Sequence, residues 1–319
     1  IVMKKASIIL KLTVFGFLLF ICVFFFLLFP KQTAKSVSEG LELCLKTVIP
    51  SLFPFMVLSG IFTSSVFCEK LSRILGKATR LIFNLSPFCS SVILISAVGG
   101  YPLGAFTARR LFEQSEISSA DFKKLLLFAV LPSPSFAVGA VGSAMLGSKN
   151  AGFLIYFSVL LASLILGIFS RLTIFKDTDS TFSSEAPNCR YEIFSSISSS
   201  IEKSGRAMLF ICFSILFFSA VLSITDSFFA SASAQMLSAA LLEVTCGCKR
   251  LSENFALPVI AGTVGWGGLC THFQIMNEIA LSGLSIPVFF AFRLLHGALS
   301  SVFCLALLKI FPVVSETLS

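Results

Sequence analysis

Long apolar runs along the chain alternate with shorter apolar runs that are interrupted by glycine, proline or charge. A membrane-spanning helix needs about 20 apolar residues, each adding 1.5 Å of length. Four runs meet this requirement: 8–29, 151–170, 205–225 and 287–311. The first run follows Lys4 and Lys5 and is longer than the apolar core of a signal peptide. It therefore predicts a membrane helix with a cytoplasmic N-terminus.

Polar positions divide the remaining chain into segments. Segments 36–49 and 191–206 carry charged residues on a helical stripe, and an apolar run follows each of them. Segment 69–86 mixes four basic residues with apolar ones, which predicts a helix lying in the membrane interface. The polar stretch 172–190 has no hydrophobic period and predicts a linker. We expect an N-terminal transmembrane helix, a first half, the linker, a second half and a tail, at 1–35, 36–171, 172–190, 191–312 and 313–319.

Two of the shorter apolar runs stop at glycine-rich turns, one at 99–105 and one at 265–274. In hydrocarbon every backbone N–H and C=O needs a partner, so irregular backbone survives only inside the protein or beside a water-filled cavity. Each turn is therefore predicted as a buried helical hairpin, with close packing of small residues as the alternative. The residues expected to shape the hairpins are Gly99, Gly100, Tyr101, Pro102, Gly104, Gly265, Gly267 and Gly268.

The two halves share their order of elements. Ser59 matches Ser219 at an offset of 160, and Gly99 matches Gly267 at an offset of 168. The shared order predicts an internal duplication, and the difference between the two offsets predicts an eight-residue insertion in the second half. Repeats with short apolar segments broken by glycine or proline at corresponding positions are typical of secondary transporters.

Composition excludes the main soluble classes. Hydrophobic residues make up 56% of the 319 residues and charged residues 13%, with 37 phenylalanines, whereas a soluble domain has about 25% charged residues. A disordered chain would need low hydrophobicity. The expected fold is an all-α polytopic transmembrane helical bundle with two similar halves and broken helices. The net charge of +8 comes mostly from bases between apolar runs, which set topology and contact lipid headgroups, so nucleic acid is not an expected partner.

The cysteines and the absent motifs argue against metal and enzyme chemistry. Most of the ten cysteines lie within apolar runs, where a free cysteine acts as a small hydrophobic residue. The tight pair Cys246 and Cys248 has no second cluster and no nearby histidine, so no metal site is predicted. The sequence has no HExxH, GxSxG or P-loop motif. Neither an enzyme activity nor a cofactor is expected.

Polar side chains gather within and after the second glycine-rich turn. Thr271, Gln274 and Asn277 are spaced by three residues, so they share one face of a helix. Ionisable residues in apolar segments usually face a partner or a cavity, and these segments contain Glu243 and Arg293. The candidate residues for binding a solute are Glu243, Thr271, His272, Gln274, Asn277, Arg293 and His296.

Structural roles remain open for several of these candidates. Glu243 either contacts a ligand or forms an ion pair with Arg293 or Lys249. Each histidine, at 272 and 296, is either a ligand-contacting residue or a neutral ring bonded to a backbone carbonyl. In the first half, the Pro-Ser-Pro break at 132–134 either offers hydroxyls and freed carbonyls or is a simple kink.

Four motifs in this order resemble the YlbJ-type sporulation integral membrane proteins. They are VIPSLFPFMVLS (48–59), GGYPLGA (99–105), LEVT (242–245) and WGGLCTHFQ (266–274), within a resemblance that spans about residues 40–311. Proteins of this type carry the nucleoside-recognition (Gate) domain. The resemblance implies a multi-pass cell-membrane protein of an endospore-forming bacterium, with a role in spore formation and cortex assembly. The Phe-rich first helix and the Cys246/Cys248 pair are not part of the pattern.

These observations favour a transporter-like permease of an unknown small polar solute or ion, with the lipid bilayer as its surroundings. The alternative is a membrane scaffold that holds spore-envelope machinery, in which the same polar residues make internal contacts. An intramembrane enzyme is the least favoured class. A homo-oligomer or spore-envelope proteins are the possible protein partners.

Overall fold

The computed structural model describes residues 13, 16, 17, 19–63, 66–172, 193–253 and 256–311. Within these ranges the chain is helical and contains no strand. The start of the first long apolar run, the predicted linker from residue 173 onward and the predicted tail lie outside the described residues. The described part confirms the expected all-α class.

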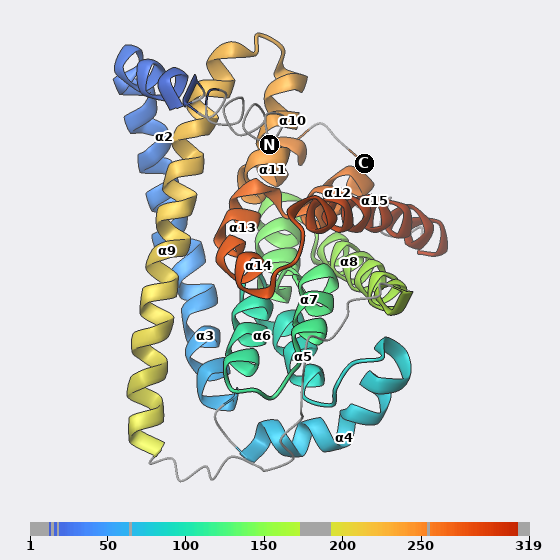
Figure 1. Cartoon of the computed structure of the whole chain (residues 1–319). Helices are drawn as coiled ribbons and strands as arrows, with labels where there is room; N and C mark the ends of the chain where they lie inside the picture. Colours follow the sequence, from blue (N-terminus) through green and yellow to red (C-terminus); the bar gives the residue numbers. More distant parts are fainter. Residues whose placement is uncertain are drawn as a thin grey trace, which may run out of the picture.

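One group of helices forms the left side of Figure 1. It contains α2 (Pro30–Leu43), the π-helical stretch Cys44–Val48, α3 (Ile49–Thr63) and the long α9 (Ile193–Phe228), which packs along α2 and α3. Preceding α2, the helix Leu19–Leu28 is bent by 102° from the segment Pro30–Val48. The chain therefore turns at Phe29, inside the region predicted as one N-terminal helix.

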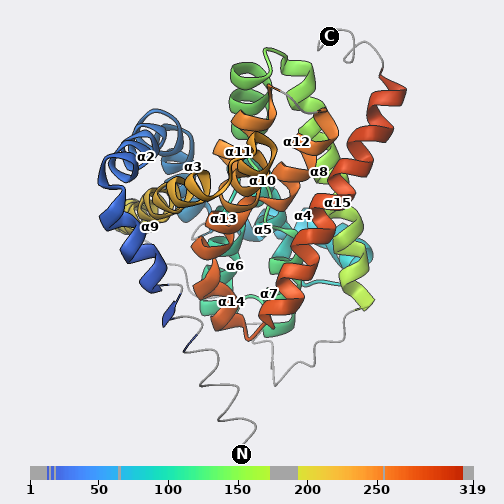
Figure 2. The ribbon, with the colours of Figure 1, turned by 90° about the horizontal axis from the view of Figure 1, so that it is seen from above.

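A second group lies on the other side of the molecule (Figures 1 and 2). It contains α8 (Lys149–Phe169), α12 (Leu257–Trp266) and α15 (Ile286–Ile310), which pack against one another. Between the two groups lie the remaining short helices, apart from α4 (Val66–Phe83) at the base of Figure 1: α5 (Cys89–Gly99), α6 (Leu103–Glu113), α7 (Ser119–Phe128), the π-helix η2 (Ser135–Met145), α10 (Ala232–Leu242), α11 (Val244–Leu251), α13 (Gly268–Gln274) and α14 (Met276–Ser282).

Three described helices are long and apolar enough to cross a membrane: Lys149–Leu172, Ile197–Phe228 and Ile286–Ile310. The bent pair Leu19–Leu28 and Pro30–Val48 adds a fourth if it counts as one span. Three of the four predicted long runs are thus confirmed. Large apolar side chains stand exposed on these helices, as a lipid-facing surface requires. The protein is an all-α integral membrane protein.

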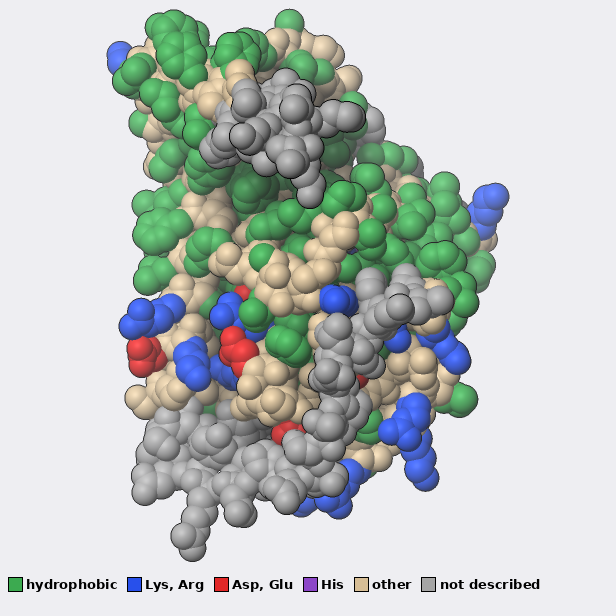
Figure 3. Space-filling view, viewed as in Figure 1, with side chains coloured by type: hydrophobic (Ala, Val, Ile, Leu, Met, Phe, Trp, Pro, Cys, Tyr) green, Lys and Arg blue, Asp and Glu red, His purple; other side chains and the backbone are tan. Residues whose placement is uncertain are grey.

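Charge is distributed unevenly over the face shown in Figure 3. Lysine, arginine and acidic side chains gather in its lower half, and hydrophobic side chains cover most of the upper half. At the base, α4 exposes Ile74 and Leu81 beside its basic residues, which fits the expected helix at the membrane interface. The charged band also crosses the N-terminal part of α9.

Candidate solute-binding site

Four interruptions of the helices meet at the centre of the molecule. They are the turn 100–102 between α5 and α6, the segment 129–134 between α7 and η2, Glu243 between α10 and α11, and Gly267 between α12 and α13. The Pro-Ser-Pro break at 132–134 thus joins the two glycine-rich turns in one place. Residue Glu243 is the interruption that the sequence did not reveal.

The interruptions pack in pairs at backbone contact distance. A Cβ added to Gly100 would lie 2.7 Å from the backbone nitrogen of Ser133, and one added to Gly268 would lie 2.8 Å from that of Val244. Gly104 approaches the same break as Gly100, because its added Cβ would lie 2.2 Å from the carbonyl oxygen of Ala129. Only a residue without a side chain permits such contacts.

Two of the four interruptions are hairpin tips, and the one at Gly267 is a bend. Helix α6 folds back along α5 after Pro102, and α11 folds back along α10 after Glu243. In contrast, α13 leads away from α12 (Figure 2). The first glycine-rich turn has the expected hairpin form, whereas the second, around Gly267, is a bend. Gly100 and Glu243 each lie at the tip of a hairpin, so they correspond in the order of elements. The sequence offset of 168 instead pairs Gly100 with Gly268.

Side chains satisfy the carbonyls that the break after α7 sets free. The Phe128 carbonyl accepts a hydrogen bond from Ser163 Oγ at 2.9 Å, and the Ala129 carbonyl accepts one from Ser96 Oγ at 2.6 Å. The next carbonyl, of Val130, accepts one from the Arg293 guanidinium at 2.9 Å. Buried irregular backbone requires a hydrogen-bond donor for each carbonyl, and these three side chains supply the donors.

Side chains also donate hydrogen bonds to the free carbonyls at the end of α12. Tyr101 Oη donates to the Val264 carbonyl, and the Arg293 guanidinium donates to the carbonyls of Gly265 and, at 3.1 Å, Trp266. Arg293 is fully buried, so one guanidinium from α15 joins the broken ends of α7 and α12. Its positive charge also faces the negative ends of both helix dipoles.

Both candidate histidines are fully buried and bonded to backbone carbonyls. His272 Nε2 lies 2.9 Å from the Trp266 carbonyl, and its ring packs edge-on against Trp266 and Phe289. His296 Nε2 lies 3.1 Å from the Val159 carbonyl. Among the described residues, neither Nδ1 has a hydrogen-bond partner. Neither histidine lines either of the two cavities described next.

A small pocket of about 80 Å³ lies where the interruptions meet. Its polar lining includes Tyr101, Ser133, Glu243, Thr271 and Gln274, so it draws on three of the interruptions and on α13, which begins after the fourth. The Glu243 carboxylate caps α11 by accepting hydrogen bonds from the backbone N–H groups of the second and third residues after it, at 3.0 and 2.7 Å. Its described bonds go to backbone rather than to Arg293 or Lys249.

A larger cavity of about 860 Å³ begins on the other side of Gln274, which lines both spaces. The exposed Asn277 also lines it, so Thr271, Gln274 and Asn277 follow one path from the small pocket outward. Sequence reasoning missed Glu278, a cavity residue that is 3% exposed. Its Oε1 lies 3.4 Å from Arg109, and its Oε2 has no described partner. Burial raises the pKa of the Glu278 carboxyl, and Arg109 opposes this.

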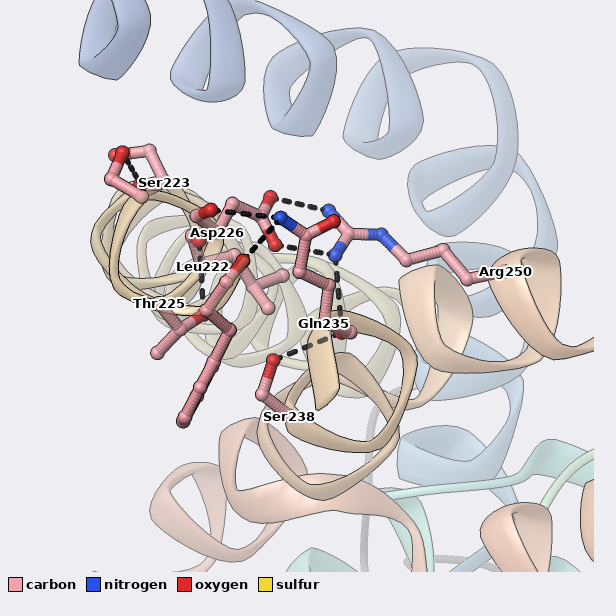
Figure 4. Close-up of polar contacts among 9 residues, drawn as sticks. Leu222, Ser223, Thr225, Asp226, Gln235, Ser238 and Arg250 are labelled. Carbon is pink, nitrogen blue, oxygen red and sulfur yellow. Dashed lines mark hydrogen bonds and ion pairs between the residues drawn. The ribbon is translucent and has the colours of Figure 1, made fainter. Parts of the chain in front are cut away.

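A polar cluster anchors the α10–α11 hairpin to α9 (Figure 4). Arg250 on α11 forms a two-point ion pair with Asp226 on α9, at 2.6 and 2.7 Å. Gln235 on α10 donates to the carbonyls of Asp226 and Phe229 at 2.9 and 2.8 Å. The cluster fixes the far end of the hairpin whose tip carries Glu243.

Replacing Arg250 with alanine is expected to lower the stability of the detergent-solubilised protein by about 1–2 kcal/mol, because a partly buried two-point ion pair is lost. The thermal unfolding midpoint measures this change. Arg206→Ala is the matched control, since its pair with Glu202 is exposed and contributes little. Equal midpoints for the two variants would contradict an anchoring role.

Comparison with known proteins supports the membrane assignment. The chain is similar to the sporulation integral membrane protein YlbJ of Bacillus subtilis (strain 168), with 22% identity over 322 aligned positions that cover 88% of this chain and 78% of the relative. This similarity confirms the resemblance that the four motifs indicated. No family model and no solved structure matches the chain. The Gate domain and the internal duplication stay predictions.

Proposed function

We propose that the protein is a transporter-like permease that binds a small polar solute between its broken helices. The observation that supports this most is the convergence of three helix interruptions and of α13 on a small pocket that has polar groups in its lining. That pocket shares Gln274 with a cavity of about 860 Å³. A solute that moves from the cavity to the pocket therefore passes the Gln274 side chain. Binding sites in secondary transporters are typically built from interrupted helices near mid-membrane.

The proposed setting of this activity is spore formation, with cortex assembly as the stage suggested by the motifs. Its support is the similarity to a curated relative named as a sporulation integral membrane protein. We place the protein in the cell membrane of an endospore-forming bacterium. The residues proposed to contact the solute are Glu243, Thr271 and Gln274 in the pocket and Asn277 in the cavity.

A membrane scaffold for spore-envelope assembly is the second candidate, and one observation favours it. Arg293, His272 and His296 are bonded to backbone carbonyls inside the protein, as residues that only hold a structure together would be. The two candidates differ in what the pocket does. A scaffold needs the pocket neither for solute binding nor for activity.

Uptake by the purified protein in liposomes separates the candidates, using a panel of nucleosides, sugars, peptidoglycan precursors and metal ions. Gln274→Leu removes a pocket amide and is expected to slow uptake of an accepted solute about tenfold, the value of one hydrogen bond. Thr271→Val should act in the same direction. Each variant should still accumulate in the membrane at the normal level.

Thr263→Val is the matched control, because Thr263 is a buried threonine of the neighbouring α12 whose hydroxyl donates to the Val259 carbonyl and which lines neither of the two cavities described above. It should leave uptake unchanged. No uptake of any panel member by the folded parent protein would refute the permease proposal and leave the scaffold.

A further inference from the structure

The larger cavity is lined by a buried carboxyl group that has few partners. Glu278 of α14 is 3% exposed, and its Oε2 has no hydrogen-bond partner among the described residues. Its Oε1 accepts one hydrogen bond from Arg109 at 3.4 Å, which is long for a bond between charged groups. Burying a charge is costly unless it is paired and hydrogen-bonded. The surroundings of Glu278 therefore favour its neutral form.

Arg109 is shared between Glu278 and a second carboxylate of the cavity. Its Nε donates to Glu113 Oε1 at 2.8 Å, one turn further along α6. This contact is shorter than the one to Glu278, and both side chains in it are partly exposed. If Glu278 loses its charge, Arg109 therefore keeps a carboxylate partner.

The charged groups around Glu278 come from the helices that pack against α14, which are α6, α7 and α13. Burial raises the pKa of the Glu278 carboxyl, Arg109 lowers it, and the negative charge of Glu113 raises it. The same three helices and the α9 wall of the cavity also carry the titratable residues Arg110, Asp121, Lys123, Lys124, Cys270, His272, Lys203 and Arg206.

The contact between Arg109 and Glu278 joins α6 to α14, close to the boundary between the two cavities. Only Ile275 separates α14 from α13, whose last residue, Gln274, lines both the larger cavity and the inner pocket. The Gln274 amide donates to Cys270 Sγ at 3.5 Å, and Cys270 lines the inner pocket. A movement of α14 away from α6 would therefore displace the side chain that stands between the two spaces.

We propose that Glu278 is a proton-binding site of the larger cavity and that the bound proton opens the way past Gln274 to the inner pocket. A hydronium ion in the cavity gives its proton to Oε2 and becomes water, and no other covalent bond changes. The neutral carboxyl no longer attracts Arg109, which stays with Glu113, so the contact between α6 and α14 weakens. The proposal concerns access to the site of the proposed function and rests on that function only for its role in transport.

Carbodiimide labelling tests the proton site without a solute. Dicyclohexylcarbodiimide reacts with protonated carboxyl groups, and mass spectrometry of peptides gives the extent at each residue. At about pH 7 we expect Glu278 to be labelled about tenfold more than Glu113, because each unit of pKa changes the ratio of neutral to charged form tenfold. Labelling of Glu278 should fall as the pH rises.

Two arginine variants test whether Arg109 acts on this site. Arg109→Gln removes the charge that favours the carboxylate, so it should increase the labelling of Glu278 at about pH 7. Arg206→Gln is the matched control, because Arg206 lines the same cavity but pairs with Glu202. It should leave the labelling unchanged.

The native thiol of Cys270 reports access to the inner pocket. Its modification by the small neutral reagent methyl methanethiosulfonate is measured at one fixed pH, so the ionisation of the thiol does not interfere. Glu278→Gln imitates the protonated carboxyl and should raise the rate about tenfold, the value of one contact between charged groups. Glu113→Gln is the matched control, because it removes the other carboxylate that contacts Arg109 but retains the α6–α14 contact. The fully buried Cys304 should stay unmodified in every folded variant.

The proposal is overturned if Glu278 is labelled no more than Glu113, or if Glu278→Gln and Glu113→Gln expose Cys270 equally. Uptake of the solute panel in liposomes is measured separately. Both expected results without any uptake would retain the proton site and refute the permease. Uptake without either expected result would retain the permease and refute the proton site.

Discussion

Arg293→Met should destabilise the centre of the molecule more than any other single substitution considered. The change leaves the buried carbonyls of Val130 and Gly265 without their described side-chain donor, whereas the Trp266 carbonyl keeps His272 Nε2 at 2.9 Å. Each unsatisfied buried polar group costs about 1–3 kcal/mol, so the total loss is about 3–5 kcal/mol, reduced by the lower cost of burying methionine. The measurement is the yield of monodisperse protein in mild detergent and its thermal unfolding midpoint.

Two further variants show which property of Arg293 matters. Arg293→Lys keeps the charge, but an ammonium does not have the planar fork that spans two helix ends, so its midpoint should fall between those of the parent and Arg293→Met. Arg80→Met changes an exposed arginine on α4 and should leave the midpoint unchanged. An unchanged midpoint for Arg293→Met would show that the carbonyls of Val130 and Gly265 do not depend on the guanidinium.

The long apolar runs and the glycine and proline interruptions could be predicted because they follow from local chemistry. Helix length in a bilayer is set by the number of apolar residues, and Gly-Gly-Tyr-Pro at 99–102 cannot continue a helix without losing hydrogen bonds. Segment 69–86 was recognisable from its mixed basic and apolar composition, and α4 occupies most of it. These predictions needed no knowledge of distant parts of the chain.

The hairpin at Glu243 could not be predicted in that way. Glutamate is an ordinary helix-forming residue, and the caps expected at a helix start are serine, threonine, aspartate and asparagine. Glu243 interrupts the helix because Gly268, 25 positions later, packs its backbone against the turn. The one local signal is a charged residue in an apolar segment, followed by β-branched Val244 and Thr245.

Sequence also grouped residues that the fold assigns to different tasks. Thr271 and His272 are neighbours on α13, yet the threonine lines the pocket and the histidine packs against Trp266. Adjacent helical positions point about 100° apart, and only the packing of α13 decides which direction is open. Polar residues at the centre therefore serve two needs: some satisfy the carbonyls of broken helices, and that arrangement leaves others free to line a cavity.

Gly268→Ala should separate α13 from the Glu243 turn. The residue has a φ of 77°, and an added Cβ would lie 2.8 Å from the Val244 nitrogen and 3.2 Å from the Glu243 Cα, all rigid backbone. The left-handed conformation costs a residue with a side chain about 1–2 kcal/mol, and overpacking adds about 1–3 kcal/mol. The thermal midpoint should fall accordingly, and solute uptake should be lost because the pocket is built on this contact.

Gly147→Ala isolates the two parts of this effect. Gly147 has a similar φ of 65°, but an added Cβ there has no atom within 4 Å, so only the conformational cost applies. Gly139→Ala should carry neither the conformational cost nor the packing cost, because Gly139 has no positive φ and an added Cβ there has no atom within 4 Å. If Gly268→Ala lowers the midpoint no more than Gly147→Ala and retains uptake, the contact between α13 and the Glu243 turn is not what holds the pocket. The two alanines differ only in the backbone that the new methyl group meets. A larger fall of the midpoint for Gly268→Ala, together with the loss of uptake, would therefore show that the α10–α11 hairpin and the bend at Gly267 depend on each other.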